Sequence, residues 1–292
     1  MKSIFITGAG GFVGGSIINY FKSEFTFNKY QKEQPLEIKE YIVFHFAGKA
    51  HDLKNVSNFE DYYKVNTDLT KKIFDCFLES EAKVFITLSS VKAVADDLNY
   101  ELTEDYIPNP KTNYGKSKLL AEKYILSKKI PPGKRVFILR PCMIHGIGNK
   151  GNLNALFKFI KLGLPWPLGA FINKRSYCSI DNLCFIINEL IHNDNISSDI
   201  FNIADDDSIS TNEIIKLMSK KLGNSPKIWN IPKSLIMIVA KIGDYCYLPL
   251  NTERLNKLTK NYIVCNSKIK STINKPLPFT ISQGLINTFE TF

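Results

Sequence analysis

Short runs of consecutive apolar residues alternate with stretches of helical spacing through the first half of the chain. Uninterrupted runs predict strands buried on both faces, as in a parallel sheet, and they lie at 4–6, 41–46, 83–88 and 135–140. Apolar residues three and four apart predict helices, for example at 62–77 and 119–125. This alternation predicts an α/β fold built on a doubly wound parallel sheet.

Three glycines follow the first predicted strand and open the first predicted helix. Gly8, Gly11 and Gly14 recur at every third position. This spacing allows a tight turn, close approach of the backbone to a pyrophosphate and close packing of helix on strand. A glycine triplet alone also fits an ordinary strand-turn-helix corner. Its position between a strand and a helix favours a Rossmann-like nucleotide site, with phosphates at the helix N-terminus.

The next predicted strand, 25–30, lacks the acidic residue that holds the ribose of NAD in many dinucleotide folds. Its end contains Asn28 and Lys29, and the acid is either missing or displaced to Glu33. The lysines would tolerate a 2′-phosphate. The sequence therefore predicts NAD(P) and leaves NAD against NADP open.

Beyond residue 146 the pattern loosens. Helical spacing returns at 181–193, 211–222 and 232–243, with short strands such as 201–203 between them. We predict a Rossmann domain for NAD(P) at 1–150 and a smaller mixed α/β lobe for substrate at 151–292. The two are interleaved, because a strand and a helix near 174–205 are expected to return to the first sheet.

Three polar side chains suggest catalysis. Tyr114 and Lys118 are four residues apart at a helix start, so they share one face. A neighbouring ammonium is expected to lower the pKa of the phenol, which would then exchange a proton with a substrate hydroxyl. Ser90 follows the strand at 83–88 and is expected to bond the same oxygen. A Tyr-Lys pair alone is a common surface feature, whereas the combination with Ser90 and the glycines favours an oxidoreductase site.

Composition limits the alternatives. The chain has 292 residues, 44% of them hydrophobic, and a formal charge of +10 spread along the sequence as lysine. The sequence contains no basic block of the kind that binds nucleic acid. The positive charge would favour a diphosphate substrate. Six scattered cysteines predict reduced thiols and no zinc site.

Hydropathy predicts no membrane span and no signal peptide. The longest apolar run, 235–240, is too short to cross a bilayer and predicts a packed or interfacial helix. The first strand follows Met1-Lys2 directly, so we expect a cytoplasmic protein.

The motifs together resemble the NAD-dependent epimerase/dehydratase family, the extended short-chain dehydrogenases/reductases that act on nucleotide sugars. The matching segments are TGAGGFVGG (7–15), HFAGKAH (45–51), LSSVKAV (88–94), YGKSK (114–118), LRPCMIHGIGNKGN (139–152) and KRSYCSIDN (174–182). The resemblance implies a catalytic trio of Ser90, Tyr114 and Lys118. It implies cofactor contacts from Gly8, Gly11, Phe12, Val13, Gly14, Ala47, Gly48, Lys49, Asn66, Leu88, Tyr114, Lys118 and Pro141, with His51 fixing the adjacent loop. Substrate contacts are expected from Ser90, Asn152, Arg175 and Arg254.

Two further expectations come with alternatives. Arg175 suits a diphosphate because a guanidinium offers paired donors, or it forms an ion pair with Asp181. Relatives are usually homodimers, and Phe74 and Phe77 either serve such an interface or belong to the core.

The chemistry within the family is narrowed by Val91 and Lys92. Sugar dehydratases that resemble this chain carry an Asp-Glu pair at these positions, so dehydration is not expected. The segments at 148–152 and 164–176 resemble the UDP-N-acetylquinovosamine dehydrogenase branch. That branch implies reduction of a UDP-4-keto-6-deoxy-N-acetylhexosamine at C4, for bacterial surface polysaccharide synthesis. The alternatives are a UDP-hexose or UDP-N-acetylhexosamine 4-epimerase and, in another class, a non-catalytic dinucleotide-binding protein.

Overall fold

A parallel sheet forms the centre of the larger half of the molecule. The computed structural model describes residues 2–50, 59–98, 100–149, 151–246 and 250–292, and within them the sheet has six strands in the order β2-β1-β3-β4-β5-β8. Their bounds are β1 Lys2–Thr7, β2 Phe25–Lys29, β3 Ile42–His45, β4 Val84–Leu88, β5 Arg135–Pro141 and β8 Asp199–Ile203. The strand order reverses between β1 and β3, which is where open α/β sheets bind ligands.

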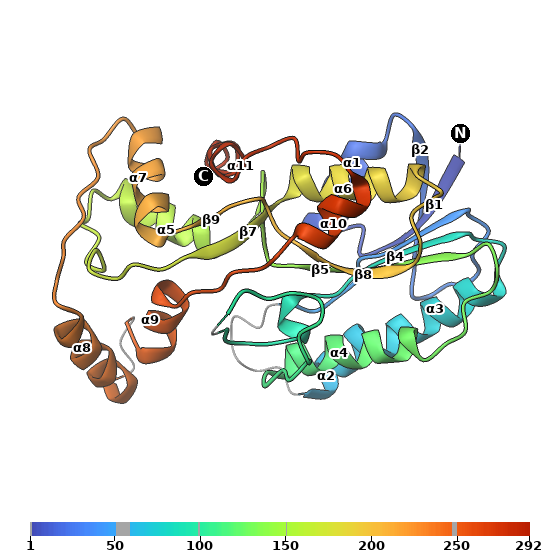
Figure 1. Ribbon diagram of the computed structural model, residues 1–292, viewed down its shortest axis with the longest axis horizontal. Coiled ribbons are helices and arrows are strands. Elements are labelled where there is room, and N and C mark those ends of the chain that lie inside the picture. The colour runs from blue at the N-terminus through green and yellow to red at the C-terminus, as the bar shows by residue number, and fades with distance from the viewer. Residues whose placement is uncertain (1, 51–58, 99, 150, 247–249) are drawn as a thin grey trace.

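Helices cover both faces of this sheet (Figure 1). One face is covered by α1 (Phe12–Phe21), α6 (Ile180–His192) and α10 (Ser267–Ile273). The other is covered by α3 (Leu69–Glu79) and α4 (Asn113–Leu126). Strand residues feed both cores because each strand is an uninterrupted apolar run. The predicted doubly wound α/β fold is confirmed.

Phe74 and Phe77 belong to the second of these cores. Both side chains have no exposed surface and pack with Phe85 of β4. They are therefore unavailable for a dimer face, and the homodimer stays a prediction.

A smaller mixed sheet lies beside the large one. Its strands within the described ranges are β6 (Met143–His145), β7 (Arg175–Ser179) and β9 (Ser208–Ile209), in the order β6-β7-β9. The surrounding helices are α5 (Asn152–Lys161), α7 (Thr211–Lys221), α8 (Lys233–Cys246), α9 (Thr252–Thr259) and α11 (Ile281–Phe289), and they form a separate apolar core with these strands. The expected return to the large sheet is made by β8, whereas β7 joins the smaller sheet. The domain boundary at residue 150 stays a prediction.

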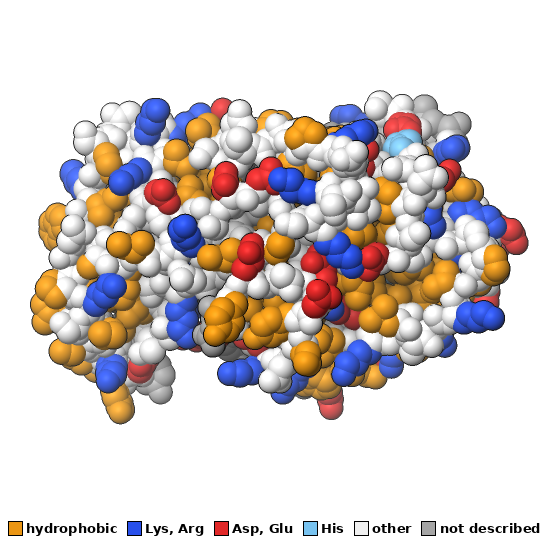
Figure 2. Space-filling view, viewed as in Figure 1, with side chains coloured by type: hydrophobic (Ala, Val, Ile, Leu, Met, Phe, Trp, Pro, Cys, Tyr) orange, Lys and Arg blue, Asp and Glu red, His pale blue; other side chains and the backbone are white. Residues whose placement is uncertain are grey.

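Charged side chains are dispersed over the surface. On the face shown in Figure 2, lysine and arginine alternate with acidic and apolar side chains. Across the described ranges, which contain all six cysteines, every cysteine is a free thiol, and no helix is long and apolar enough to span a membrane. No cluster of three metal-ligating side chains was found in the same residues.

Candidate active site

The glycine corner between β1 and α1 packs directly against the loop that follows β3. Gly8 has a φ of +74°, and a Cβ there would lie 2.5 Å from the Ala47 nitrogen. A Cβ at Gly14 would lie 2.2 Å from the Gly8 carbonyl oxygen. Neither position can hold a side chain without moving backbone, so these glycines bring the strand, the helix and the loop after β3 together.

The N-terminus of α1 is open to an anion. Gly11 is the N-cap residue, makes no side-chain capping bond, and no acidic residue lies in the first turn, which starts at Phe12 and Val13. A Cβ built at Gly10 would meet nothing within 4 Å. Backbone N–H groups of this turn can therefore receive a phosphate. These features fit a dinucleotide diphosphate.

Asn66 holds the loop after β3 in place. Its Oδ1 accepts from the Lys49 nitrogen at 2.8 Å, and its Nδ2 donates to the Lys49 carbonyl at 3.1 Å and to Ser117 Oγ at 2.9 Å. Asn66 is fully buried in a short π-helical turn, η1 (Lys64–Asp68), which follows α2 (Phe59–Tyr63). One side chain thus connects Ala47-Gly48-Lys49 to α4.

No acidic residue at the end of β2 takes the place of the carboxylate that holds the NAD ribose in many dinucleotide folds. Asn28 donates through Nδ2 to the carboxylate of Glu40 at 2.9 Å, and Glu40 also accepts from the Lys39 backbone. Glu40 therefore serves an internal contact. His51 lies outside the described residues.

Ser90 and Tyr114 meet at the carboxyl edge of the sheet. Ser90 follows β4 and begins a short 3-10 turn, η2 (Val91–Ala93), where its Oγ accepts from the Lys92 nitrogen at 3.2 Å. Tyr114 lies in the first turn of α4, which is capped by Thr112. Ser90 lies close enough to Tyr114 to lower the pKa of the phenol, and the Tyr62 ring lies edge-on to Tyr114 at 6.2 Å between centroids.

The electrostatics of Tyr114 differ from the sequence expectation. Burial raises the pKa of Tyr114, and the hydrogen bond with Ser90 offsets only part of that effect. The expected lowering by the Lys118 ammonium is wrong for this arrangement, because that ammonium donates instead to the Leu88 carbonyl at 2.8 Å. Tyr114 is therefore a neutral phenol here, which is a proton donor.

Lys118 is buried against Gly48. Its Nζ lies 3.0 Å from the position that a Cβ at Gly48 would take. Burial lowers the pKa of Lys118 to about 8, and the nearby Glu122 carboxylate acts in the opposite direction. A buried lysine whose pKa is lowered toward neutral pH is typical of a functional site.

A buried ion pair beneath Lys118 was missed by the sequence reasoning. Arg140 donates from Nε to Glu122 Oε1 at 2.9 Å and from Nη2 to Oε2 at 2.6 Å, and Ser89 Oγ donates to the same carboxylate. Glu122 lies one helical turn after Lys118, so the spacing was an available signal. Arg140 precedes Pro141, the last residue of β5. This network fixes α4 against β4 and β5.

Lys92 and Arg175 flank the Tyr262 ring. The Lys92 Nζ lies 4.1 Å from the ring centroid and the Arg175 Cζ lies 6.0 Å from it. Arg175 donates to the carbonyls of Lys257 and Lys260 at the end of α9, rather than pairing with Asp181.

Both cations lack a carboxylate within ion-pair distance in the part of the chain that the structure describes, and Lys92 Nζ donates to the Asp96 carbonyl at 2.6 Å. The pKa of Lys92 is lowered to about 8, chiefly by burial; the Asp96 carboxylate acts in the opposite direction, and the Arg175 and Lys257 charges contribute to the lowering. Sequence reasoning noted Lys92 only as a departure from the dehydratase pattern. Its place two residues after Ser90 was the signal.

The remaining predicted substrate residues lie on two helices of the smaller lobe. Asn152 is the first residue of α5 and is exposed, and Arg254 lies in the first turn of α9. The fold therefore brings the catalytic trio together with Gly48 and Asn66. Arg175 lies near this group because it and Lys92 contact the same Tyr262 ring. Asn152 and Arg254 lie further along the lobe.

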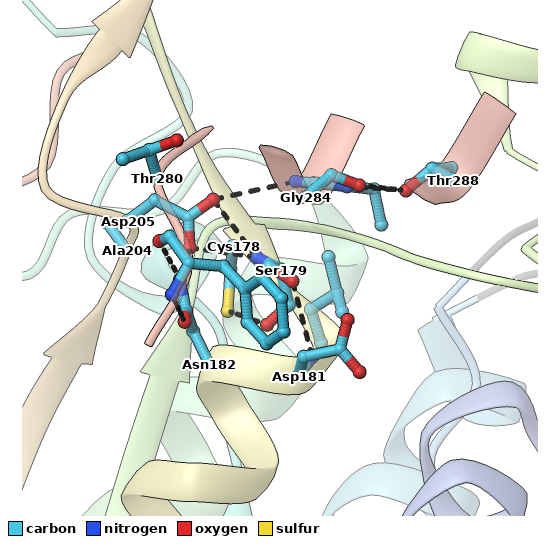
Figure 3. Close-up of polar contacts among 12 residues, drawn as sticks. Cys178, Ser179, Asp181, Asn182, Ala204, Asp205, Thr280, Gly284 and Thr288 are labelled. Atoms are coloured by element: carbon cyan, nitrogen blue, oxygen red, sulfur yellow. Dashed lines mark hydrogen bonds and ion pairs between the residues drawn. The ribbon is translucent and has the colours of Figure 1, made fainter. Parts of the chain in front are cut away.

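A buried polar cluster joins the two sheets and orients β7 (Figure 3). Asp205, after β8, accepts from the Ser179 nitrogen at 3.0 Å and from Asn182 Nδ2 at 2.7 Å. Ser179 ends β7, so Asp205 sets the position of the strand that begins with Arg175. His145 of β6 bonds Thr288 of α11 at 2.8 Å in the same region.

Comparison with known proteins agrees with this geometry. The model of the NAD dependent epimerase/dehydratase family matches residues 33–204. The chain belongs to this family. It is accordingly an NAD-dependent enzyme of the nucleotide-sugar type, with NAD or NADP as cofactor.

Relatives span the whole chain. A UDP-glucose 4-epimerase of Vibrio cholerae is 27% identical and covers 100% of this chain and 95% of its own. An N-acetyl-alpha-D-glucosaminyl-diphospho-ditrans,octacis-undecaprenol 4-epimerase of Escherichia coli O157:H7 is 25% identical, with 99% and 94% covered. The solved structure of MoeE5 in complex with UDP-glucose and NAD has a TM-score of 0.77 at 16% identity over 99% of this chain and 98% of its own, which confirms the fold.

Proposed function

We propose that this chain is a 4-epimerase of a hexose carried on a diphosphate, with UDP-hexose or UDP-N-acetylhexosamine as the first candidates. The observation that carries the proposal is the placement of Ser90 beside Tyr114, with Lys118 buried one helical turn further along α4. Both relatives described above that align along the whole chain are 4-epimerases by name. This favours epimerisation over the net C4 reduction that the sequence motifs suggested.

Tyr114, Ser90 and Lys118 have different roles in the proposed reaction. Tyr114 exchanges a proton with the C4 oxygen, and Ser90 donates a hydrogen bond to the same oxygen. The Lys118 ammonium lies close enough to the Gly48 loop to bind a ribose hydroxyl. When bound, the cofactor would supply hydride acceptance and return at C4. Epimerisation then requires the 4-keto sugar to present its other face before hydride returns.

The cofactor site is assigned to the glycine corner and the loop after β3. Backbone N–H groups at Phe12 and Val13 would hold the diphosphate, while the Gly11 N–H closes the turn by donating to the Gly8 carbonyl at 3.0 Å. Ala47, Gly48 and Lys49 would border the cofactor, since Asn66 fixes their backbone. Leu88 and Pro141 end neighbouring strands of the same edge.

The substrate diphosphate is assigned to Lys92 and Arg175. Both cations lie against the Tyr262 ring, and neither forms an ion pair with a carboxylate in the described ranges. Lys92 is two residues from Ser90 along the chain. Two adjacent uncompensated charges favour a multivalent anion. Asn152 and Arg254 remain candidate contacts to the rest of the nucleotide.

Dehydration does not fit the site. The positions that follow Ser90 hold the buried, apolar Val91 and the cationic Lys92. Elimination of water needs an acid and a base there, and neither side chain provides both.

A 4-keto reductase is the second candidate, on one specific observation. The end of β2 has no acidic residue, and the nearby Glu40 carboxylate accepts a hydrogen bond from Asn28. No carboxylate at this strand end is therefore placed to bind the cofactor ribose. Weak ribose binding favours a cofactor that exchanges, which a reductase requires and an epimerase does not.

The carrier of the diphosphate also has two candidates. The name of the Escherichia coli relative describes a sugar diphosphate on a polyprenol, whereas the Vibrio cholerae relative is named for UDP-glucose. Lys92 and Arg175 would bind a diphosphate of either kind.

Product analysis tests the proposal. Purified protein is incubated with UDP-glucose or UDP-N-acetylglucosamine and catalytic NAD, and the sugars are separated by C4 configuration. Epimer is expected, and Tyr114→Phe should lower its rate on the order of a hundredfold or more. Tyr124→Phe is the matched control, because Tyr124 lies on the same helix and bonds Asp75. Equal rates for the two variants would overturn the assignment of Tyr114.

A further inference from the structure

Helix α8 carries an apolar stripe that no other element of the described residues covers. Leu235, Ile238, Ile242 and Tyr245 follow each other at spacings of three, four and three, so they form one helix face. Ile238 is 54% exposed and Tyr245 is 87% exposed. The helix is held to the lobe through a different face, formed by its buried residues Ile236, Ala240 and Gly243.

Exposed large apolar side chains are concentrated on α8 rather than scattered evenly over the surface. Twenty large apolar side chains are exposed in the described ranges, and six of them lie on this helix of 14 residues. They are Leu235, Met237, Ile238, Val239, Ile242 and Tyr245. Single exposed apolar residues are ordinary, whereas a contiguous patch marks a binding surface. At 14 residues the helix is too short to span a bilayer, so its partner must cover it from one side.

One lysine borders the stripe. Lys241 precedes Ile242 on α8 and has no carboxylate within ion-pair distance among the described residues, whereas the Lys233 Nζ lies 5.7 Å from the centroid of the Phe171 ring, away from the stripe. The one acid of the helix, Asp244, accepts hydrogen bonds from Thr252 of α9. Figure 2 shows apolar and basic side chains together at the end of the molecule where Figure 1 places α8. Apolar side chains bordered by a lysine match the chemistry of an anionic lipid surface.

A short structural path joins α8 to the proposed diphosphate site. Asp244 binds the first residue of α9, and the carbonyls of Lys257 and Lys260 at the other end of α9 receive the Arg175 guanidinium. An eight-residue helix is about 12 Å long. A diphosphate at Arg175 would therefore lie about one short helix from the apolar stripe.

We propose that α8 lies in the surface of an anionic membrane, with its apolar stripe among the acyl chains and Lys241 at the headgroups. This placement gives the diphosphate site access to a substrate whose diphosphate is attached to a lipid. The substrate class rests on the proposed function, whereas membrane binding rests on α8 alone.

Vesicle flotation tests the membrane contact with the full chain. Wild-type protein is mixed with phosphatidylcholine vesicles or with vesicles that also contain phosphatidylglycerol. We expect binding to the anionic vesicles that weakens with salt, because lysine–headgroup attraction is screened. Ile238→Ser/Ile242→Ser should lower the partition coefficient tenfold or more. Tyr20→Ser/Ile286→Ser, exposed apolar positions on α1 and α11, should bind like wild type.

Epimerase turnover on a soluble UDP-sugar separates this inference from the proposed function. The α8 variant should keep wild-type turnover and thermal unfolding while it loses vesicle binding. Wild-type protein that does not float with anionic vesicles would overturn the inference and leave the epimerase proposal standing. Equal flotation of the α8 variant, or a dimer by light scattering that the α8 substitutions dissociate without any vesicle binding, would also overturn it.

Discussion

The Lys118 ammonium and Gly48 are in van der Waals contact: a Cβ at Gly48 would lie 3.0 Å from Nζ. The loop after β3 can approach α4 this closely only because residue 48 has no side chain. Gly48→Ala should therefore displace the flexible end of Lys118 with little effect on stability. We expect a loss of about tenfold in kcat, since a misplaced acid-base partner weakens the proton transfer.

Gly15→Ala is the matched control for Gly48→Ala, because Gly15 is exposed on α1 and a Cβ there would meet only the Ala9 carbonyl oxygen, at an ordinary contact distance of 3.8 Å. It should leave kcat within about twofold of wild type. A Gly48→Ala enzyme as active as Gly15→Ala would show that the position of Lys118 is unimportant.

The Glu122–Arg140 ion pair should support both stability and the charge of Lys118. Glu122→Gln leaves a buried guanidinium without its counter-charge, which costs about 3 to 5 kcal/mol in the free energy of unfolding. Urea unfolding measures this change. Glu290→Gln, which breaks an exposed pair with Lys221, should change the free energy of unfolding by less than about 1 kcal/mol. Similar effects of the two substitutions would contradict the structural role of Glu122.

Activity should fall as the pH rises through about 8. Burial lowers the pKa of Lys118 to about 8, so its side chain loses its proton in this range and no longer binds the cofactor ribose as an ammonium. In Glu122→Gln this alkaline limb should move to lower pH, because the carboxylate raises the pKa of Lys118.

Lys92 also has a pKa near 8 and could produce the same limb. Lys92→Gln distinguishes the two groups. A limb that persists in Lys92→Gln belongs to Lys118, whereas its disappearance would assign the pH dependence to substrate binding by Lys92.

Lys92 and Arg175 should recognise phosphate rather than the nucleoside. Lys92→Gln and Arg175→Gln are each expected to weaken UDP binding about tenfold or more by calorimetry, with uridine binding unchanged. Lys123→Gln removes an exposed lysine of α4 and should leave both affinities as in wild type. Equal losses for UDP and uridine would mean that the cations act through the fold of the lobe.

The sequence was informative wherever local pattern decides structure. Apolar runs predicted the strands of the large sheet, the glycine spacing predicted the β1–α1 corner, and the Tyr114–Lys118 spacing with Ser90 predicted three side chains at one edge. Each depends on neighbours along the chain or on the shared edge of a parallel sheet.

Features set by tertiary contacts were harder to predict. The pattern of β7 indicates a strand, but its partners β6 and β9 are chosen by the docking of the smaller lobe. Phe74 and Phe77 have helical spacing that suits either a core or an interface. The pKa of Tyr114 depends on burial and on where the Lys118 ammonium points, and spacing fixes neither.

The central claim is that hydride leaves C4 of a diphosphate-linked hexose and returns to the same carbon. Purified protein with catalytic NAD and UDP-glucose or UDP-N-acetylglucosamine deuterated at C4 tests it directly, with mass spectrometry and NMR of the epimer. The account predicts an epimer that retains deuterium at C4, without net formation of reduced cofactor. An epimer with solvent hydrogen at C4, or conversion only when NAD(P)H is consumed in equal amount, would contradict it.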